Sequence, residues 1–490
     1  MAPLLPSTAP APGLTVVIGL GRSGLGAARL LHAQGRPVCV IEGRRTEALE
    51  RTAEALRAEG IAVELGLPLE QASLDGLPGL RTQPLAAVIV SPGIRWDHPL
   101  LEQLRQRGVA VHGELVPAWR ASTGIPWIGI TGTNGKTTVT HLVSHVLQQS
   151  GVDAPMAGNV GHSAAERVLE RLRDERGLPS WLVVEMSSYQ IEAAAEVAPR
   201  IGLWTTLTPD HLERHGTLEA YRAIKRSLLE RSTLRILNAD DPDLRAHAHT
   251  WDQATWISAS GRDRLPDACQ EALWIEAGQV WQRTAGQERA VMAADALAMP
   301  GAHNRQNMLM AAAAGLAVGL SGTQLEQAFR SFPGVPHRLE RIRELAGVRY
   351  FNDSKATNYD AAQVALQALP GPLVVLAGGE SKRGDASGWL TALASQARAV
   401  VLFGAAQAEF EGLLQGAGFP GVVHRCPGLA EAVPLATELA QTHDCRAVLL
   451  SPACASFDLF RNYEDRGEQF RTAVLEKAKE MLNQNQPVQG

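Results

Sequence analysis

Strand-like and helix-like segments alternate along almost the whole of this chain. In its first part the strand-like segments are residues 15–18, 38–41, 86–90 and 109–111, and helical patterns cover 23–34 and 46–57. The alternation restarts with the strand-like residues 127–130 and starts again at 348–351. Strands that are connected through helices pair in parallel, so we predict an α/β protein with parallel sheets.

The length of the chain predicts more than one domain. At about 150 residues per domain, 490 residues correspond to roughly three domains, so we expect three separate hydrophobic cores. The apolar residues 308–320 are too few to span a bilayer and predict a buried helix. The expected bounds of leader, three domains and tail are 1–13 (disordered), 14–120, 121–334, 335–482 and 483–490 (frayed).

Charge and cysteine content argue against several kinds of partner. A formal net charge of -5 gives no general attraction for phosphate backbones or anionic lipid, so we expect neither nucleic acid nor a membrane as partner. The five cysteines are odd in number and widely scattered, and none forms a CxxC pair. This pattern argues against a disulfide framework or a structural zinc site and favours the reducing cytoplasm.

A glycine-rich loop, 19–24 (GLGRSG), follows the first strand and opens a helix, and Glu42 ends the next strand. In this dinucleotide fingerprint, glycines let a pyrophosphate approach backbone amides at a helix N-terminus. The loop alone leaves three ligands or roles open: a nicotinamide or flavin cofactor, another diphosphate such as a UDP-sugar, or a structural tight turn.

A second loop, 131–138 (TGTNGKTT), lies between a strand and a helix and is similar to a P-loop, although Gly132 and Gly135 are closer than the usual pattern allows. Its amides would hold the β- and γ-phosphates, Lys136 would neutralise them, and Thr137 would help to hold Mg²⁺. A dehydrogenase needs no ATP site, so a phosphoryl-transfer enzyme with a diphosphate-bearing substrate explains both loops. We predict a Rossmann-like N-terminal domain, a central P-loop ATPase-like domain and a Rossmann-like C-terminal domain.

Three further segments, 352–358 (NDSKATN), 451–456 (SPACAS) and 462–467 (NYEDRG), complete a pattern that resembles the Mur ligases, relatives of the folylpolyglutamate synthetases. The resemblance extends over about residues 16–470 and is most specific for the branch that adds D-glutamate to UDP-N-acetylmuramoyl-L-alanine. It implies a cytoplasmic, monomeric ATP-dependent ligase of peptidoglycan precursor synthesis, with small-molecule substrates, two Mg²⁺ sites and an acyl-phosphate intermediate.

The resemblance also implies roles for residues around the second loop. ATP binding is expected of Gly132, Thr133, Asn134, Gly135, Lys136, Thr137, Thr138, Asn307, Arg338 and Asp353, with His337 adjoining them. Metal binding is expected of Thr137, Glu185, His211 and Lys225, and catalysis of Lys136, His211 and Lys225. The alternatives are a solvated strand end for Glu185, a structural role for His211 and a helix N-cap for Asn307.

Lys225 stands out because it lies among Leu218, Tyr221 and Leu228 at helical spacings of three and four, on a helix that Thr217 should begin. The simple interpretation is that its ammonium group reaches water past its neighbours. The family resemblance implies instead that the lysine is carbamylated and becomes a metal ligand, which requires a lowered pKa.

The remaining implied residues bind the two other substrates. The UDP-substrate set is Arg22, Ser23, Glu42, Arg44, Ser91, Asn159 and Ser187, and the D-glutamate set is Lys355, Thr357, Lys382, Ser456 and Tyr463. Asn159 and Ser187 could equally cap helices. Gly43 stands where relatives have a hydroxyl and Tyr463 where they often have phenylalanine, so the uridine contacts and the role of the tyrosine hydroxyl stay open.

Three other functions remain to be separated from this one. A sister ligase would add L-alanine, a diamino acid or glutamate on folate, and the SKATN and SPACAS segments argue against it. A nicotinamide oxidoreductase would use the first loop but leave the second unexplained. A nucleotide-binding regulator would bind ATP without releasing phosphate.

Overall fold

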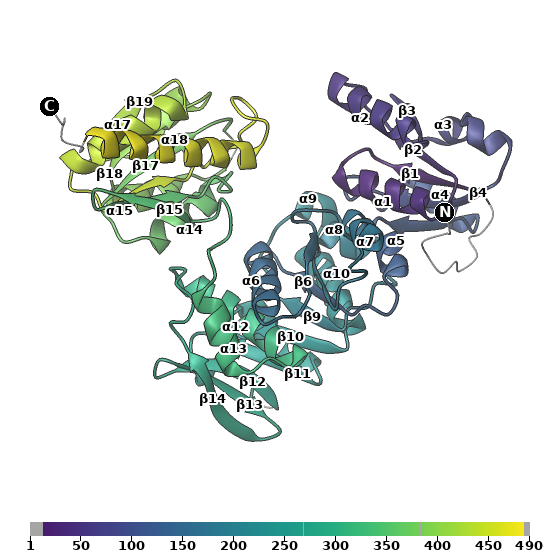
Figure 1. Cartoon of the computed structure of the whole chain (residues 1–490), viewed down its shortest axis with the longest axis horizontal. Helices are drawn as coiled ribbons and strands as arrows, with labels where there is room; N and C mark the ends of the chain where they lie inside the picture. The colour runs from purple at the N-terminus through teal and green to yellow at the C-terminus, as the bar shows by residue number, and fades with distance from the viewer. Residues whose placement is uncertain (1–12, 268, 382–383, 485–490) are drawn as a thin grey trace. The chain divides into compact units, whose positions relative to one another are not determined.

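The computed structural model describes residues 13–484 except 268 and 382–383, and contains three sheets with helices on their faces (Figure 1). The chain folds into two compact units, one running to Phe332 without Met299–Gly301, the other made of Met299–Gly301 and the chain from Pro333. The first unit holds two sheets and the second holds one. No described helix is both long and apolar enough to cross a membrane.

The first sheet is entirely parallel and has the order β3-β2-β1-β4-β5. Its strands are β1 Leu14–Ile18, β2 Val38–Glu42, β3 Ala62–Leu65, β4 Leu85–Val90 and β5 Ala110–Gly113. Its helices are α1 Arg22–Ala33, α2 Glu47–Ala58, α3 Gln71–Asp75, α4 Pro99–Gln106 and α5 Leu115–Ala121, with a 3-10 turn at Pro78–Arg81. Chain order reverses between β1 and β4, so the loops after these strands lie side by side, as in other doubly wound sheets.

The second sheet has the order β14-β13-β12-β11-β10-β9-β6-β8-β7. Its strands are β6 Trp127–Thr131, β7 Met156–Gly158, β8 Leu182–Glu185, β9 Ile201–Trp204, β10 Leu234–Asn238, β11 Ala254–Ser258, β12 Glu271–Glu276, β13 Gln279–Thr284 and β14 Gln287–Ala293. Its helices are α6 Lys136–Gln149, α7 Ala164–Arg173, α8 Ser188–Glu192, α9 Leu212–His215, α10 Leu218–Arg231, α11 Pro242–Ala246, α12 Ala302–Val318 and α13 Gly322–Arg330, with 3-10 turns at Ala248–Thr250 and Arg262–Arg264. The strands pair in parallel up to β12, while β13 and β14 are antiparallel additions.

The third sheet has the order β15-β16-β20-β17-β18-β19, with only β15 antiparallel. Its strands are β15 Glu340–Leu345, β16 Val348–Asn352, β17 Leu373–Gly378, β18 Ala397–Phe403, β19 Val422–Arg425 and β20 Ala447–Leu450. Its helices are α14 Tyr359–Ala368, α15 Ser387–Gln396, α16 Gln407–Gly416, α17 Leu429–Thr442 and α18 Tyr463–Gln484. The predicted α/β class is therefore confirmed, whereas the antiparallel edges of two sheets were not foreseen.

The predicted buried helix is α12, which begins six residues earlier than expected. Its residues from Met308 to Gly315 are buried, and it packs against α6. A helix that is apolar on all sides is stable only inside a protein, so α12 forms the centre of the core on one face of the second sheet.

The expectation of three separate cores is wrong for the first unit. One apolar cluster includes Ala27 and Leu30 of α1 together with Ala165 and Val168 of α7, so the first and second sheets share a core. Gly26 permits this contact, because a Cβ at that position would lie 2.2 Å from Ser163 Oγ. The sequence hides this feature, since a glycine inside a helical pattern does not show which partner it approaches.

We predict that Gly26→Ala destabilises the first unit by about 1–3 kcal/mol, because the added methyl group forces α1 and α7 apart. The matched control is Gly21→Ala, where a Cβ would meet nothing within 4 Å and φ is -79°. In calorimetry, Gly26→Ala should melt at a lower temperature than the wild type. The free energy of unfolding of Gly21→Ala should stay within a few tenths of a kcal/mol of the wild-type value. Equal melting of both variants would contradict the close packing of α1 on α7.

Candidate active site

The loop after β6 has a backbone conformation that favours glycine at two positions. Gly132 has φ 147° and Gly135 has φ 82°, both in the region that disfavours side chains. A Cβ would lie 1.9 Å from Thr205 Oγ1 at the first position and 2.8 Å from Asn307 Oδ1 at the second. The loop is therefore pressed against the end of β9 and against α12.

This loop presents backbone amides at the N-terminus of α6. Thr133 N donates to Thr206 O over 2.8 Å, and Asn134 N donates to Thr206 Oγ1 over 3.0 Å, so the segment after β9 braces the loop. The loop and the first turn of α6 bring together the predicted residues from Gly132 to Thr138, and the Thr137 and Thr138 side chains are buried. A helix N-terminus attracts phosphate through the N–H groups of its first turn and through its dipole.

Two lysines converge on one carbonyl of the loop. Lys136 Nζ donates to Gly132 O and Thr133 O over 2.8 Å each, and Lys225 Nζ donates to Gly132 O over 3.0 Å. Lys225 Nζ also lies 3.3 Å from Thr131 Oγ1. Two like charges beside a phosphate-binding loop make a strongly positive site that an anion would stabilise.

Lys225 does not reach water, so the simple interpretation of this residue is wrong. Its side chain is 1% exposed, and its ammonium lies 4.5 Å from the centre of the Tyr221 ring. The Thr217 side chain caps α10, as predicted, and this places the lysine on the buried face of the helix. Burial holds the pKa of Lys225 well below its usual value, and repulsion from Lys136 lowers it further.

Glu185 ends β8, the strand next to β6, and is 2% exposed, so it is not a solvated strand end. Asn159 Nδ2 donates to its Oε1 over 2.9 Å, whereas Glu185 Oε2 is buried and has no hydrogen-bond partner among the described residues. A buried carboxylate oxygen without a partner is costly unless a cation binds it. Glu185 beside the β6 loop therefore fits a Mg²⁺ ligand, and the Thr137 hydroxyl has the oxygen chemistry that this ion prefers.

His211 lies in a loop that is tied to the phosphate loop, since Thr208 N donates to Thr133 Oγ1 over 3.1 Å. Its side chain is 44% exposed, its φ is 54°, and its ring packs against Tyr189 and Tyr221. Asp210, beside it, is close enough to Lys225 to oppose the lowering of that lysine's pKa. The structure thus brings His211 to the neighbourhood of Lys225 with an imidazole that ligands can approach.

Two side chains stabilise the first glycine loop, one at the end of β2 and one directly after β4, the strands on either side of β1. Ser91 Oγ donates to Gly19 O over 3.2 Å, and Glu42 Oε2 accepts from Leu20 N over 3.0 Å. Burial acts to raise the pKa of Glu42, but the hydrogen bonds from Leu20 and Arg44 outweigh it and hold this pKa below its usual value. Glu42 therefore stabilises the loop itself, as expected of a structural tight turn.

Arg22 and Arg44 of the same predicted set are exposed at the surface of this loop region. Arg44 Nε lies 3.2 Å from Glu42 Oε1, so its position is set by the carboxylate that closes the loop. Both guanidinium groups can turn toward an anion without losing a buried contact.

The capping alternatives have different outcomes. Ser187 is the N-cap of α8 and forms a capping box with Gln190, so that alternative is confirmed. Asn159 binds Glu185 and caps no described helix. Asn307 is the sixth residue of α12, not its N-cap. Its Oδ1 packs against the phosphate loop, because a Cβ on Gly135 would lie only 2.8 Å from it.

In the second unit, Asp353, Lys355 and Thr357 lie on the loop after β16, and Ser456 lies on the loop after the adjacent strand β20. Asp353 follows β16 and is buried; it accepts from Ser451 Oγ over 3.0 Å and from Leu339 N over 3.1 Å. Burial raises the pKa of Asp353 to about 7, against the opposing effect of Arg338. Among the described residues Arg338 Nε is buried without a hydrogen-bond partner, so this guanidinium can bind a further anion.

Other predicted residues of this unit lie near these loops or at the start of α18. Lys355 Nζ lies 5.6 Å from the centre of the Tyr463 ring, and His337 meets that ring edge to face at 6.2 Å. Thr357 is half-buried in the loop after β16, and Ser456 is buried in the loop after β20. Lys382, which follows β17, lies outside the described residues.

Arg466 joins these three loops, and we did not predict a role for it. Its fully buried guanidinium donates to Ser354 Oγ and Ser354 O over 2.9 and 2.8 Å, to Cys454 O over 3.0 Å and to Ala455 O over 3.2 Å, with Gly378 O at 3.5 Å. Burial lowers its pKa to about 10, which still leaves it charged at neutral pH. The available sequence signal was that Arg466 begins the buried row that continues through Phe470, Val474 and Ala478.

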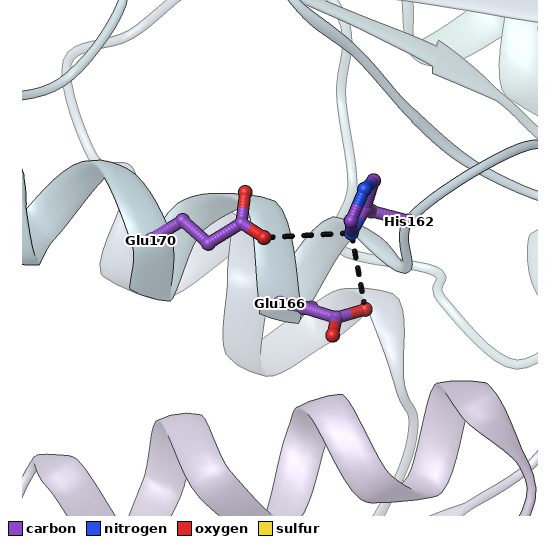
Figure 2. A group of neighbouring side chains, drawn as sticks. All are labelled: His162, Glu166 and Glu170. Carbon is purple, nitrogen blue, oxygen red and sulfur yellow. Dashed lines mark ion pairs between the residues drawn. The ribbon is translucent and has the colours of Figure 1, made fainter.

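A separate group of possible metal ligands lies at the start of α7 (Figure 2). His162 Nδ1 is 3.5 Å from Glu166 Oε2 and 3.4 Å from Glu170 Oε1, and all three ligand atoms lie within 4.8 Å of one another. The side chains are partly exposed, and Arg167 pairs with Glu170 over 2.7 Å. Surface ion pairs therefore account for this group, which shares no residue with the predicted metal set.

Three family models match successive parts of the chain. The MurD-like N-terminal domain of Mur ligases matches residues 13–113, the Mur ligase middle domain 130–315, and the glutamate ligase domain of Mur ligases 337–454. Each model covers one of the three sheets or most of it.

Curated relatives match nearly the full length. A UDP-N-acetylmuramoylalanine--D-glutamate ligase of Synechococcus sp. (strain CC9605) is 57% identical over 461 residues, which is 94% of this chain and 98% of that protein. The ligase of the same name from Thermosynechococcus vestitus is 44% identical over 94% of this chain and 99% of its own length.

Solved structures share the fold at much lower identity. The UDP-N-acetylmuramate-alanine ligase MurC of Thermotoga maritima is 18% identical with a TM-score of 0.55, over 95% of this chain and all of that one. A type C pseudomurein peptide ligase of Methanothermus fervidus is 19% identical with a TM-score of 0.53, at the same coverage. Together with the three domain matches and the close relatives, this shows that the chain belongs to the Mur ligase family.

Proposed function

We propose that this chain is an ATP-dependent ligase that joins D-glutamate to UDP-N-acetylmuramoyl-L-alanine in peptidoglycan precursor synthesis. The observation that carries the chemistry is the convergence of two lysines, Lys136 and the buried Lys225, on one carbonyl of the phosphate-binding loop. The choice of substrates is supported by the names of the close relatives and by the SKATN and SPACAS segments of the third domain.

The reaction needs concentrated positive charge. A carboxylate repels nucleophiles and has no good leaving group, so the L-alanyl carboxylate attacks the γ-phosphorus of ATP, ADP leaves, and an acyl phosphate forms. The neutral amine of D-glutamate then attacks the acyl carbon, phosphate leaves with the C–O electron pair, and the amine loses a proton. Lys136 and the loop amides hold the transferring phosphoryl group and offset the repulsion between two anionic substrates.

Two Mg²⁺ ions would further neutralise the phosphates and polarise their oxygens. We assign Thr137 and Glu185 to one ion, and His211 and a carbamylated Lys225 to the other. Carbamylation forms when the neutral Lys225 amine attacks CO₂ and releases a proton, so the lowered pKa of this lysine favours it. The modification replaces a buried positive charge next to Lys136 with a negative one.

We divide the other predicted residues between the two remaining substrates. The first loop, through Arg22, Ser23, Arg44, Ser91 and its amides, would hold the UDP portion, with Glu42 shaping that loop. Asn159 and Ser187 would meet the muramoyl end. Arg338, Asp353 and Asn307 would contact ATP, and D-glutamate would be held by Lys355, Thr357, Lys382, Ser456 and Tyr463. ATP and UDP-linked substrates belong to the cytoplasm, and we propose a monomer because one chain supplies every residue named.

The proposed reaction is tested by phosphate release from the purified protein with Mg-ATP and UDP-N-acetylmuramoyl-L-alanine. We expect release only when D-glutamate is also present, and not with L-glutamate, L-alanine or a diamino acid, because the acyl phosphate must react with the amine before the cycle closes. Release with another amino acid would keep the reaction and change the branch. ATP binding without release would favour a regulator, and NAD(P)H binding at the first loop would favour an oxidoreductase.

The proposed carbamylation of Lys225 can be tested separately. Protein supplied with ¹³C-bicarbonate should show a carbamate carbon by NMR that Lys225→Arg lacks, because arginine keeps its proton and cannot capture CO₂. The variant should lose roughly 10²-fold or more in kcat, since the carbamate ligand proposed for the second Mg²⁺ is lost. A wild-type enzyme that is fully active with no carbamate signal would overturn the assignment.

A further inference from the structure

Glu114 is a buried carboxyl group to which the proposed reaction gives no role. It lies directly after β5, where the first sheet ends and α5 begins, and its side chain is 2% exposed. Charged groups are rarely buried in this way unless they are paired or hydrogen-bonded. Among the described residues no arginine or lysine forms an ion pair with it, so its hydrogen bonds must explain its presence.

Two polar side chains from different parts of the first unit meet this carboxyl group. Gln190 Nε2, from α8 of the second sheet, donates to Glu114 Oε1 over 2.7 Å. Ser23, in the first turn of α1, lies close enough to the same carboxyl group to influence its pKa. Burial raises the pKa of Glu114 to about 7, and the Gln190 amide and the Ser23 hydroxyl act in the opposite direction.

The contact with Glu114 fixes the orientation of the Gln190 amide. Since Nε2 is used by Glu114, Oε1 faces the N-terminus of α8, where it accepts from Ser187 N over 2.9 Å and Ser187 Oγ over 3.1 Å. A hydrogen-bonded path thus runs from Glu114 through Gln190 to Ser187, and Ser23 lies beside its Glu114 end. An amide turned by 180° would place a donor against Ser187 N and break the capping box.

We propose that Glu114 is a positioning residue that fixes Ser23 and Ser187 relative to each other and thereby sets the affinity for the UDP-linked substrate. This rests on the proposed function, in which these two serines meet the same substrate from the first and the second sheet. Glu114 itself does not touch the substrate. It holds the loop and the α8 N-terminus at the separation that the substrate spans, which lowers the ordering cost of binding.

A simpler role would be to hold the two sheets together, but other contacts already do so. Gly113 N donates to Ala193 O over 2.7 Å, and Arg120 forms a two-pronged ion pair with Glu196 over 2.7 and 2.8 Å. Neither contact touches Ser23, Gln190 or Ser187. They provide a matched control, because a variant there weakens the same interface and leaves the path intact.

Three variants separate positioning from general stability. Glu114→Met keeps the approximate volume but removes both acceptors, which leaves the Gln190 amide buried without its partner. Glu114→Gln keeps an acceptor for Gln190 and offers Ser23 a donor, which a hydroxyl can accept. Arg120→Gln removes the ion pair with Glu196 and serves as the control.

In phosphate release assays we expect Glu114→Met to raise KM for UDP-N-acetylmuramoyl-L-alanine about tenfold or more, which is the loss typical of one unsatisfied buried polar group. KM for ATP and kcat should stay close to wild type. Glu114→Gln should restore KM to within a few-fold, and Arg120→Gln should leave it unchanged. A similar rise in KM for all three substrates of Glu114→Met, namely the UDP-linked substrate, ATP and D-glutamate, would overturn the proposal. The same rise in KM for the UDP-linked substrate in Arg120→Gln would also overturn it.

Hydrogen exchange gives a readout that does not depend on the substrate. In Glu114→Met the amides of Ser187 and of α8 should exchange faster than in wild type, while those of α6 should not. If the wild-type protein binds no UDP-linked substrate but this exchange pattern appears, the proposed function fails and the Glu114 path stands. Unchanged exchange at Ser187 would refute the path itself.

Discussion

Parallel strands impose the constraint on which every predicted site in this protein depends. When neighbouring strands run in the same direction, the loops that follow them leave the sheet at the same edge. The β6 loop is thereby placed beside the end of β8, which carries Glu185, and beside the end of β9, which Thr205 follows. The sheet topology alone therefore makes neighbours of residues that are far apart in sequence.

A second constraint acts inside this arrangement, namely the burial of like charges. Lys136 and Lys225 share one carbonyl acceptor, and the second of them has no access to water. Such a pair raises the free energy of the protein without ligands. A bound anion, loss of a proton or conversion of one lysine to an acid removes that cost. The same positive potential stabilises the negative charge of a phosphoryl group during its transfer.

Much of the fold and part of the site could be predicted, because they follow from short-range patterns. The Thr217 cap, the buried face that includes Lys225 and the convergence of the C-terminal loops all follow from spacing and from parallel pairing. Asn307 was harder, because helix α12 begins at Ala302, before the apolar run on which its start was judged. Antiparallel β13 and β14 were missed because their residues alternate weakly between buried and exposed positions.

The contacts of Glu114 and Arg466 could not be predicted from spacing, since each side chain ties together loops that are distant in sequence. Arg466 has the same signal as Lys225, a cation in a buried row on a helix, yet the two groups suit opposite purposes. A guanidinium offers five donors in a fixed fork and stays charged even with its pKa lowered to about 10, so it can hold four carbonyl groups and a hydroxyl in place. An ammonium loses its proton far more readily when it is buried, which makes Lys225 unsuitable as a permanent clamp and suitable for chemistry. The choice between arginine and lysine at a buried helical position therefore indicates whether a site needs a fixed support or a reactive group.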